Sequence, residues 1–280
     1  MFAQKLNNMQ EDTPLILVTN DDGITAPGIR NLISIMNEIG QVVVVAPDKP
    51  QSGTSHSVTV RDILRIRKQN VPNNSHIEYS CSGTPADCVK IAKNEILDRK
   101  PDLCVSGINH GSNAAINVIY SGTMSAAIEA GIEGMPSIGF SLMDKDWNAD
   151  FKPLEEYIRM ITKTVLKQGI PSGTVLNVNF PKIDNIKGVR VCRQCKGSWK
   201  EVFERRVNPA GDTYYWLDGE FVNWENTDNQ DTDISLLDSG YATVVPVKFD
   251  MTDYNAIPKL DFLNINSESS VNPENIMHMS

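Results

Sequence analysis

The sequence predicts an α/β fold in which helices flank a mostly parallel sheet, and three observations carry this prediction. Short apolar runs of strand length stand at residues 15–18 and 42–46, and such runs are typical of strands buried on both faces. Between them lies a stretch with apolar positions at helical spacing, which makes a strand–helix–strand unit with parallel strands. From residue 187 onward, alternating and aromatic segments indicate hairpins of a smaller β-rich C-terminal region.

The first elements place two polar segments at one edge of the sheet. The first strand ends at Asn20-Asp-Asp-Gly, and the helix after it begins near Pro27. The second strand leads into a polar loop, residues 47–57. Because the carboxyl ends of parallel strands share one edge, this loop is expected beside Asp21 and Asp22.

Later segments continue the alternation of strands and helices. Residues 58–81 alternate in polarity and predict a small antiparallel excursion. Thr84 and Asp87 have the spacing of a capping box, with Pro85 in the first turn of the helix that follows. The remaining core elements are expected at residues 101–106 (strand), 126–130 (helix), 136–141 (strand), 154–166 (helix) and 174–180 (strand).

The change of pattern at residue 187 divides the chain. The expected parts are a flexible leader (1–13), an α/β core (14–186), a β-rich oligomerisation region (187–256) and a loose tail (257–280). In the third part, four aromatic residues stand in short hairpin-like segments: Trp199, Trp216, Phe221 and Trp224. Either the main domain or a second subunit must cover them, so a homo-oligomer is expected.

Composition and charge exclude several classes of protein. The formal net charge of −9, without a long Lys/Arg run, argues against binding of nucleic acid polymers. Residues 1–13 lack the apolar centre of a signal peptide, and no later run approaches a membrane span, so a cytoplasmic protein without a membrane partner is expected. The five cysteines are odd in number and lie mostly in apolar elements, which favours reduced thiols.

Two adjacent acids, Asp21 and Asp22, end the first strand. In open α/β sheets, ligands bind outside the carboxyl ends of the strands. Neighbouring carboxylates at a buried strand end raise each other's pKa unless a cation or several donors compensate, and a divalent metal is the simplest compensation. The alternative is that residues 20–23 form only a turn, since Asn, Asp and Gly are the residues that turns favour.

Two further polar segments are expected near these acids. Asn109 follows the strand at residues 101–106. Ser121-Gly122-Thr123 precedes a helix of small residues, where backbone amides and two hydroxyls make a candidate phosphate site. The alternative is that both hydroxyls only cap the helix. If Thr123 contacts phosphate, its replacement by Ala should slow turnover and leave metal binding intact.

Five motifs stand in order along the chain: Ile16–Ile24, Val45–Asp48 with Gln51-Ser-Gly, Ser82–Lys90, Val105–Asn109 and Ser121–Ala126. Thr232-Asp233 and Gly240–Pro246 follow. This set resembles the survival protein SurE family of metal-dependent 5'/3'-nucleotidases over most of residues 14–254. Several ordered motifs are far more specific than any one of them.

The resemblance implies a Rossmann-like body, a swapped C-terminal arm exchanged between subunits, and a homodimer or homotetramer. It also implies four metal ligands: Asp21, Asp22, the Ser52 hydroxyl and the Asn109 side-chain oxygen. An all-oxygen set with two anions suits Mg²⁺ or Mn²⁺ rather than zinc. Many members carry Arg-Gly-Pro after the Asn, whereas this chain has His110-Gly-Ser, which puts its affinity for an anionic substrate in question.

The expected activity is hydrolysis of nucleoside 5'- and 3'-monophosphates by a divalent-metal-dependent phosphatase. Asp21 and Asp22 are the catalytic candidates, and either could orient or deprotonate the nucleophile. His56 and His110 are candidates for the acid that protonates the leaving group, with a surface or capping role as the alternative for each. Within this class, an exopolyphosphatase or a broader phosphomonoesterase remains open.

Two other classes share the predicted sheet. A receiver-type signalling domain needs a phospho-accepting Asp after the third core strand, where this chain has Ser106-Gly-Ile-Asn109. A dinucleotide-binding dehydrogenase needs Gly-x-Gly-x-x-Gly after the first strand, where this chain has Asp-Asp-Gly. The phosphatase is therefore the favoured interpretation.

Overall fold

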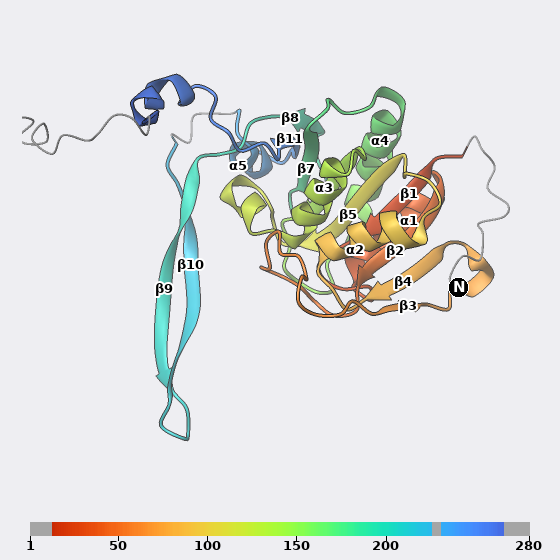
Figure 1. Cartoon of the computed structure of the whole chain (residues 1–280), viewed down its shortest axis with the longest axis horizontal. Coiled ribbons are helices and arrows are strands. Elements are labelled where there is room, and N and C mark those ends of the chain that lie inside the picture. The colour runs from red at the N-terminus through yellow and green to blue at the C-terminus, as the bar shows by residue number, and fades with distance from the viewer. Residues whose placement is uncertain (1–12, 226–230, 266–280) are drawn as a thin grey trace, which may run out of the picture. The chain divides into compact units, whose positions relative to one another are not determined.

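The computed structural model describes residues 13–225 and 231–265. Its contacts divide the chain into two compact units, residues 1–249 and 250–280. Apart from Thr13, the predicted leader lies outside the described residues. Within the described ranges of the first unit, nine strands form one sheet (Figure 1). In spatial order they are β3 (Ile66–Lys68), β4 (Ile77–Cys81), β2 (Gln41–Pro47), β1 (Leu15–Thr19), β5 (Leu103–His110), β6 (Ser137–Leu142), β7 (Thr174–Phe180), β11 (Ala242–Lys248) and β8 (Val189–Val191).

The sheet is mostly parallel, and the predicted fold class is confirmed. The six strands from β4 to β7 in this order run parallel to their neighbours, whereas β3 and β11 pair antiparallel with β4 and β7. The chain passes from β1 to β2 on one side and later to β5 on the other. The carboxyl end of β1 is therefore the switch point of the sheet, where ligands bind in folds of this kind.

Strand β1 is buried on both faces, as its apolar run predicts. Ile16 and Val18 belong to the core formed with α1 (Pro27–Asn37) and α4 (Lys152–Gln168). Leu15 and Leu17 belong to the core on the opposite face, which includes residues of α2 (Pro85–Ile91) and α3 (Gly122–Ile132). Each fully buried side chain of this size contributes about 1.5–3 kcal/mol, so β1 is fixed rigidly in the middle of the sheet.

The helix starts agree with their sequence signals. Thr84 Oγ1 accepts a hydrogen bond from the backbone N–H of Asp87 at 3.2 Å, and Asp87 Oδ2 accepts from the N–H of Thr84 at 2.9 Å. This is the predicted capping box of α2, and a π-helical turn, η2 (Ala92–Ile96), follows the helix. Ser121 caps α3, where its hydroxyl accepts from the N–H of Met124 at 3.0 Å.

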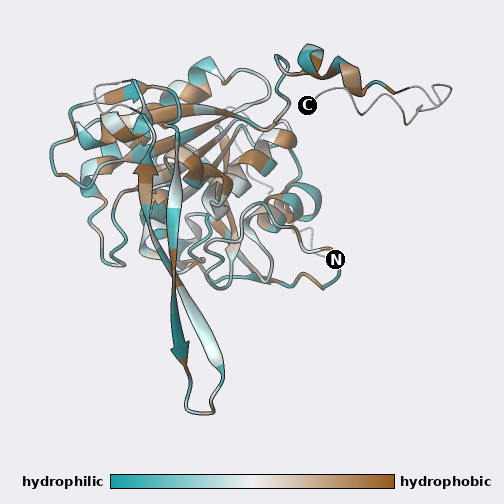
Figure 2. Cartoon of the chain, turned by 90° about the vertical axis from the view of Figure 1, so that its left-hand side faces the viewer, coloured by the Kyte–Doolittle hydropathy of each residue, from teal (hydrophilic) through white to brown (hydrophobic). Residues whose placement is uncertain are grey.

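A long hairpin, here called the arm (residues 197–223), leaves the body of the first unit. Its strands β9 (Gly197–Val207) and β10 (Thr213–Asn223) pair antiparallel along their whole length. Both views show it extending away from the nine-stranded sheet (Figure 1), and Figure 2 shows hydrophobic residues interrupted by hydrophilic ones along it. Phe203 and Trp216 are 64% and 58% exposed, so the arm has no core of its own.

Three segments differ from the sequence prediction. Within the expected β-rich region, β8 and β11 join the nine-stranded sheet instead of a separate subdomain. Within the expected antiparallel excursion, only β3 and β4 are strands, and β4 pairs parallel with β2 in the main sheet. In the second unit, residues 257–263 of the expected tail form the 3-10 helix η4 (Ile257–Leu263). Alternating polarity predicts a half-buried strand, but it does not say which strand is its neighbour.

The described part of the chain contains no helix long and apolar enough to cross a membrane. All five cysteines are free, as expected. Four of them are buried, namely Cys81, Cys88, Cys104 and Cys195, and Cys192 is partly exposed.

Candidate metal and phosphate site

Asp21 lies at the carboxyl end of β1 and against the first turn of α3. Thr123 donates its hydroxyl proton to Asp21 Oδ1 across 2.5 Å. A Cβ atom on Gly122 would stand only 2.7 Å from Asp21 Cβ and 2.9 Å from Asp21 Oδ2. The absence of a side chain at Gly122 is therefore what allows the helix start to approach this carboxylate.

The electrostatics of Asp21 are those of a carboxylate that lacks a counter-charge. Burial, and after it the charge of Asp22, raise the pKa of Asp21 to about 6, although the Thr123 hydroxyl acts in the opposite direction. Asp21 is only 4% exposed. A cation bound beside the two acids would remove the cause of this shift, because it would favour the charged form of both.

Asp22 is held by the residue that ends β5. The backbone N–H of His110 donates to Asp22 Oδ2 at 3.2 Å, and Nδ1 of the same residue lies 2.9 Å from that oxygen. The imidazole ring stacks on Trp147 at 5.4 Å between centroids and meets Phe151 edge-on at 5.3 Å. His110 thus fixes the orientation of Asp22, a role that its position after Asn109 did not reveal.

The other two predicted ligands lie one residue away from groups that bind the acids. Asn109 precedes His110, and its side-chain N–H donates to Gly111 O at 2.7 Å, so that Oδ1 is the side-chain atom left for a ligand. Ser52 follows Gln51, whose backbone N–H donates to the carbonyl oxygen of Asp21 at 2.7 Å. Ser52 itself is exposed in the loop at residues 47–57.

This donor set fits a hard divalent cation. Two adjacent carboxylates stand at the carboxyl end of β1, and burial, followed by the charge of Asp22, raises the pKa of Asp21. Among the described residues, no three His, Cys, Asp or Glu side chains gather in a way that could hold a metal ion. Neutral oxygens such as those of Asn109 and Ser52 would complete such a set, and they are the ligand type that Mg²⁺ and Mn²⁺ accept and that zinc sites rarely use.

The structure gives the two hydroxyls of the predicted phosphate site other partners. Ser121 caps α3, and the fully buried Thr123 donates to Asp21. The Thr123 hydroxyl is therefore part of the support of the acids, which the sequence did not show because the contact joins residues 102 positions apart. What remains for a phosphate is the positive end of the α3 dipole beside Asp21.

His56, the second histidine considered, is bound away from the acids. Its Nε2 lies 2.8 Å from Glu129 Oε2, and Lys90 Nζ donates to the other oxygen of Glu129 at 2.6 Å. Burial raises the pKa of Glu129, but the hydrogen bonds from His56 and Lys90 outweigh burial and hold this pKa below its ordinary value. Glu129 was missed by the sequence prediction, although a lone acid in a helix of small residues was the available signal.

The fold and this site define a class of protein: an α/β protein with paired acids at the sheet's switch point, next to a helix N-terminus suited to phosphate. The survival protein SurE family model matches residues 16–201. The chain belongs to this family, as its motifs predicted.

Relatives named 5'-nucleotidase SurE extend over nearly the whole chain. The protein from Christiangramia forsetii is 59% identical over 261 residues, which cover 92% of this chain and 100% of the relative. That from Flavobacterium psychrophilum is 60% identical over 255 residues, with 90% and 98% covered. The crystal structure of the SurE protein from Aquifex aeolicus is similar with a TM-score of 0.77 at 38% identity, over 90% of this chain and 100% of that one.

Proposed function

We propose that this chain is a divalent-metal-dependent phosphatase that hydrolyses nucleoside 5'- and 3'-monophosphates to nucleoside and phosphate. The observation that carries the proposal is the pair Asp21 and Asp22 at the switch point of the sheet, in contact with the first turn of α3 through Thr123. The name 5'-nucleotidase that the relatives bear supports the nucleotide as substrate.

In this proposal, four residues would hold Mg²⁺ or Mn²⁺: Asp21, Asp22, Ser52 and Asn109. When bound, such a cation polarises a phosphoryl group and lowers the pKa of a water molecule. Thr123 fixes Asp21 and His110 fixes Asp22, each through one carboxylate oxygen, so both acids keep one orientation while charge builds up on the phosphoryl group. The N-terminus of α3 would stabilise that negative charge.

The leaving nucleoside oxygen needs a proton, and the two histidines differ as donors. The Nδ1 atom of His110 is engaged by Asp22, and its Nε2 atom is buried with no partner among the described residues. The Nε2 atom of His56 is engaged by Glu129. Neither contact selects one histidine as the acid, and solvent water serves the same purpose when the leaving alcohol is exposed.

An exopolyphosphatase or a broader phosphomonoesterase is the second candidate, because both reactions use the same metal site. A phosphate-release assay separates them. The panel would contain nucleoside 5'- and 3'-monophosphates, ribose 5-phosphate, a simple aryl phosphate and polyphosphate, each with Mg²⁺, Mn²⁺ or a chelator. The proposal requires the highest kcat/KM for a nucleotide and loss of activity with chelator. Metal-independent hydrolysis, or a preference for polyphosphate, would overturn it.

We also propose that the protein acts as a homodimer or homotetramer in the cytoplasm. The exposed aromatic and aliphatic residues of the arm support an assembly in which a second copy covers them. The free thiols support a reducing compartment.

A further inference from the structure

The arm meets the edge of the site through a side-chain hydrogen bond. Trp199, near the start of β9, donates from Nε1 to Asn117 Oδ1 across 2.7 Å. Asn117 lies in the 3-10 helix η3 (Ala115–Ile119), which leads from β5 to α3. Phe221 of β10 meets the Trp199 ring edge-on, with 6.4 Å between centroids. The paired strands of the arm therefore hold the indole in the position from which it binds η3.

The end of η3 in turn holds the loop that carries Ser52. Ser55 donates its hydroxyl to Ile119 O at 2.6 Å and its backbone N–H to Tyr120 O at 3.3 Å. On the other side of Ser52, the backbone N–H of Gln51 donates to Asp21 O at 2.7 Å. Ser52 therefore lies between two anchors, one on a carboxylate residue of the site and the other on the end of η3.

The two halves of the segment from residue 113 to 120 are stabilised differently. In the first half, the backbone N–H groups of Asn113 and Ala115 donate to Asn179 at 2.8 Å and to Asp233 at 2.7 Å. In the second half, Ile119 and Tyr120 are 46% and 50% exposed. Val118, between them and Asn117, is buried in a small core cluster. The hydrogen bond from the arm therefore bears on the exposed end of η3, to which Ser55 binds.

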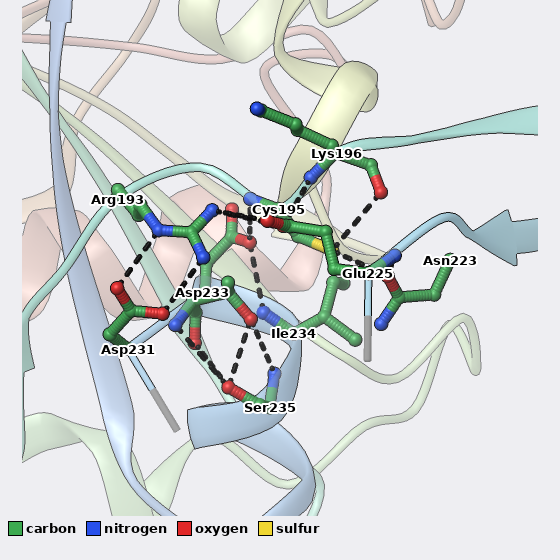
Figure 3. Close-up of polar contacts among 10 residues, drawn as sticks. Arg193, Cys195, Lys196, Asn223, Glu225, Asp231, Asp233, Ile234 and Ser235 are labelled. Carbon is green, nitrogen blue, oxygen red and sulfur yellow. Dashed lines mark hydrogen bonds and ion pairs between the residues drawn. The ribbon is translucent and has the colours of Figure 1, made fainter. Parts of the chain in front are cut away.

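Asp233 fixes the base of the arm, drawn in Figure 3, to the same segment. The buried carboxylate of Asp233 accepts from the N–H of Ala115 with one oxygen, at 2.7 Å. Its other oxygen accepts from the N–H of Cys195 at 2.8 Å. Arg193, two residues before Cys195, forms ion pairs with Glu225 and Asp231. These contacts set the point where the arm leaves the body, four residues before Trp199.

We propose that Trp199 is a positioning residue of the metal site. Through Asn117 and η3, the arm holds the Ser52 loop against Asp21, and a displacement of the arm loosens that loop without touching the acids. The proposal rests on the proposed function for its metal, but the contact between the arm and the loop can be tested without it. Such coupling is established when a substitution at the contact between Trp199 and Asn117 changes the behaviour of the loop that carries Ser52.

The test uses the full chain and four variants. Trp199→Phe keeps the aromatic ring and removes the N–H donor, whereas Asn117→Ala removes the acceptor. Asn117→Asp keeps an acceptor and is the conservative control. Trp216→Phe is the matched control on the same arm, because Trp216 is 58% exposed on β10 and the same atom is removed.

The first measurement is hydrogen exchange of the backbone amides at residues 51–57, in metal-free buffer without substrate. The second is the Kd for Mn²⁺ by calorimetry. Loss of a neutral hydrogen bond shifts an equilibrium by about two- to tenfold. We expect exchange that much faster and a Kd that much weaker in Trp199→Phe and Asn117→Ala. The two controls stay near wild type, and the melting temperature stays constant.

The double variant Trp199→Phe/Asn117→Ala decides whether the two residues act as a pair. An effect no larger than that of either single variant supports the proposal, and a sum of the two effects overturns it. Unchanged exchange in both single variants, or an equal change in Trp216→Phe, also overturns it. If Trp199→Phe lowers the melting temperature, the proposal is judged on the hydrogen exchange and the Mn²⁺ affinity of Asn117→Ala. If the wild type binds no Mn²⁺, the proposed function fails, and the exchange data still decide whether the arm holds the loop.

Discussion

Thr123 donates its hydroxyl proton to Asp21 Oδ1 across 2.5 Å, and this contact joins the first turn of α3 to the end of β1. The position of the Asp21 carboxylate therefore depends on a hydroxyl of the neighbouring helix. Hydrogen bonds to a charged group are worth about 1.5–3 kcal/mol. Thr123 therefore supports a carboxylate of the site, and the phosphate contact expected from the sequence stays a prediction.

Replacing Thr123 by Val should weaken metal binding and turnover together. The substitution keeps the shape of the side chain but removes the donor, which corresponds to a loss of about tenfold or more in metal affinity. Thr123→Ser keeps the hydroxyl and should retain most of the affinity. Calorimetric titration with Mn²⁺ and phosphate-release kinetics measure both quantities. Slower turnover with unchanged metal affinity would instead support the direct phosphate contact expected from the sequence.

Replacing Asp22 by Asn should reduce metal affinity and kcat/KM by at least about tenfold, since loss even of a residue that only orients a ligand costs 10–100-fold. The fold should persist, because Asn keeps an oxygen that can accept from His110. Circular dichroism checks the fold, and Asp184→Asn, at an exposed position, is the control. A folded Asp22→Asn protein with normal metal affinity and normal turnover would falsify the assignment of Asp22.

The free energy of unfolding of the metal-free protein should fall with rising pH because of Asp21. Its pKa is raised from 3.8 to about 6, first by burial and then by Asp22. A carboxyl group of this kind stabilises the folded state while protonated. That contribution is complete below about pH 4, and about 3 kcal/mol of it is lost as the pH rises through 6.

Comparison with Asp21→Asn isolates this contribution from the other carboxyl groups. The free energy of unfolding of the wild type, minus that of the variant, should fall between pH 4 and 7 and level off above. Urea unfolding at several pH values in metal-free buffer gives the difference. A difference that stays constant across this range would contradict the prediction. Added Mg²⁺ should reverse the loss near neutral pH, since the metal favours the charged form.

The arm should mediate assembly. Phe203 and Leu217 form a cross-strand pair, and their side chains are 64% and 63% exposed. Introducing Glu at both positions should leave the fold intact and shift a dimer or tetramer toward monomer in sedimentation velocity at micromolar concentration. Met160→Glu, at a partly exposed position on α4, is the control. A wild-type protein that sediments as a stable monomer would exclude assembly through the arm.

The sequence by itself determined the mostly parallel sheet, its helices and the family. Apolar runs of strand length such as residues 15–18 are typical of strands buried on both faces, and the capping box at Thr84 and Asp87 is a local signal that needs no tertiary information. It also placed Asp21 and Asp22 at the carboxyl end of the first strand, because the change from apolar to polar residues marks where that strand ends.

Only the tertiary structure decided how these parts support one another. The partner of Thr123 is 102 residues away, that of His110 is 88 residues away, and that of Trp199 is 82 residues away. Strands β8 and β11 likewise joined the main sheet, although their alternating pattern was equally consistent with a separate hairpin. The physical reason is the same throughout: local pattern fixes what a segment becomes, but the identity of its neighbour depends on packing across the whole fold.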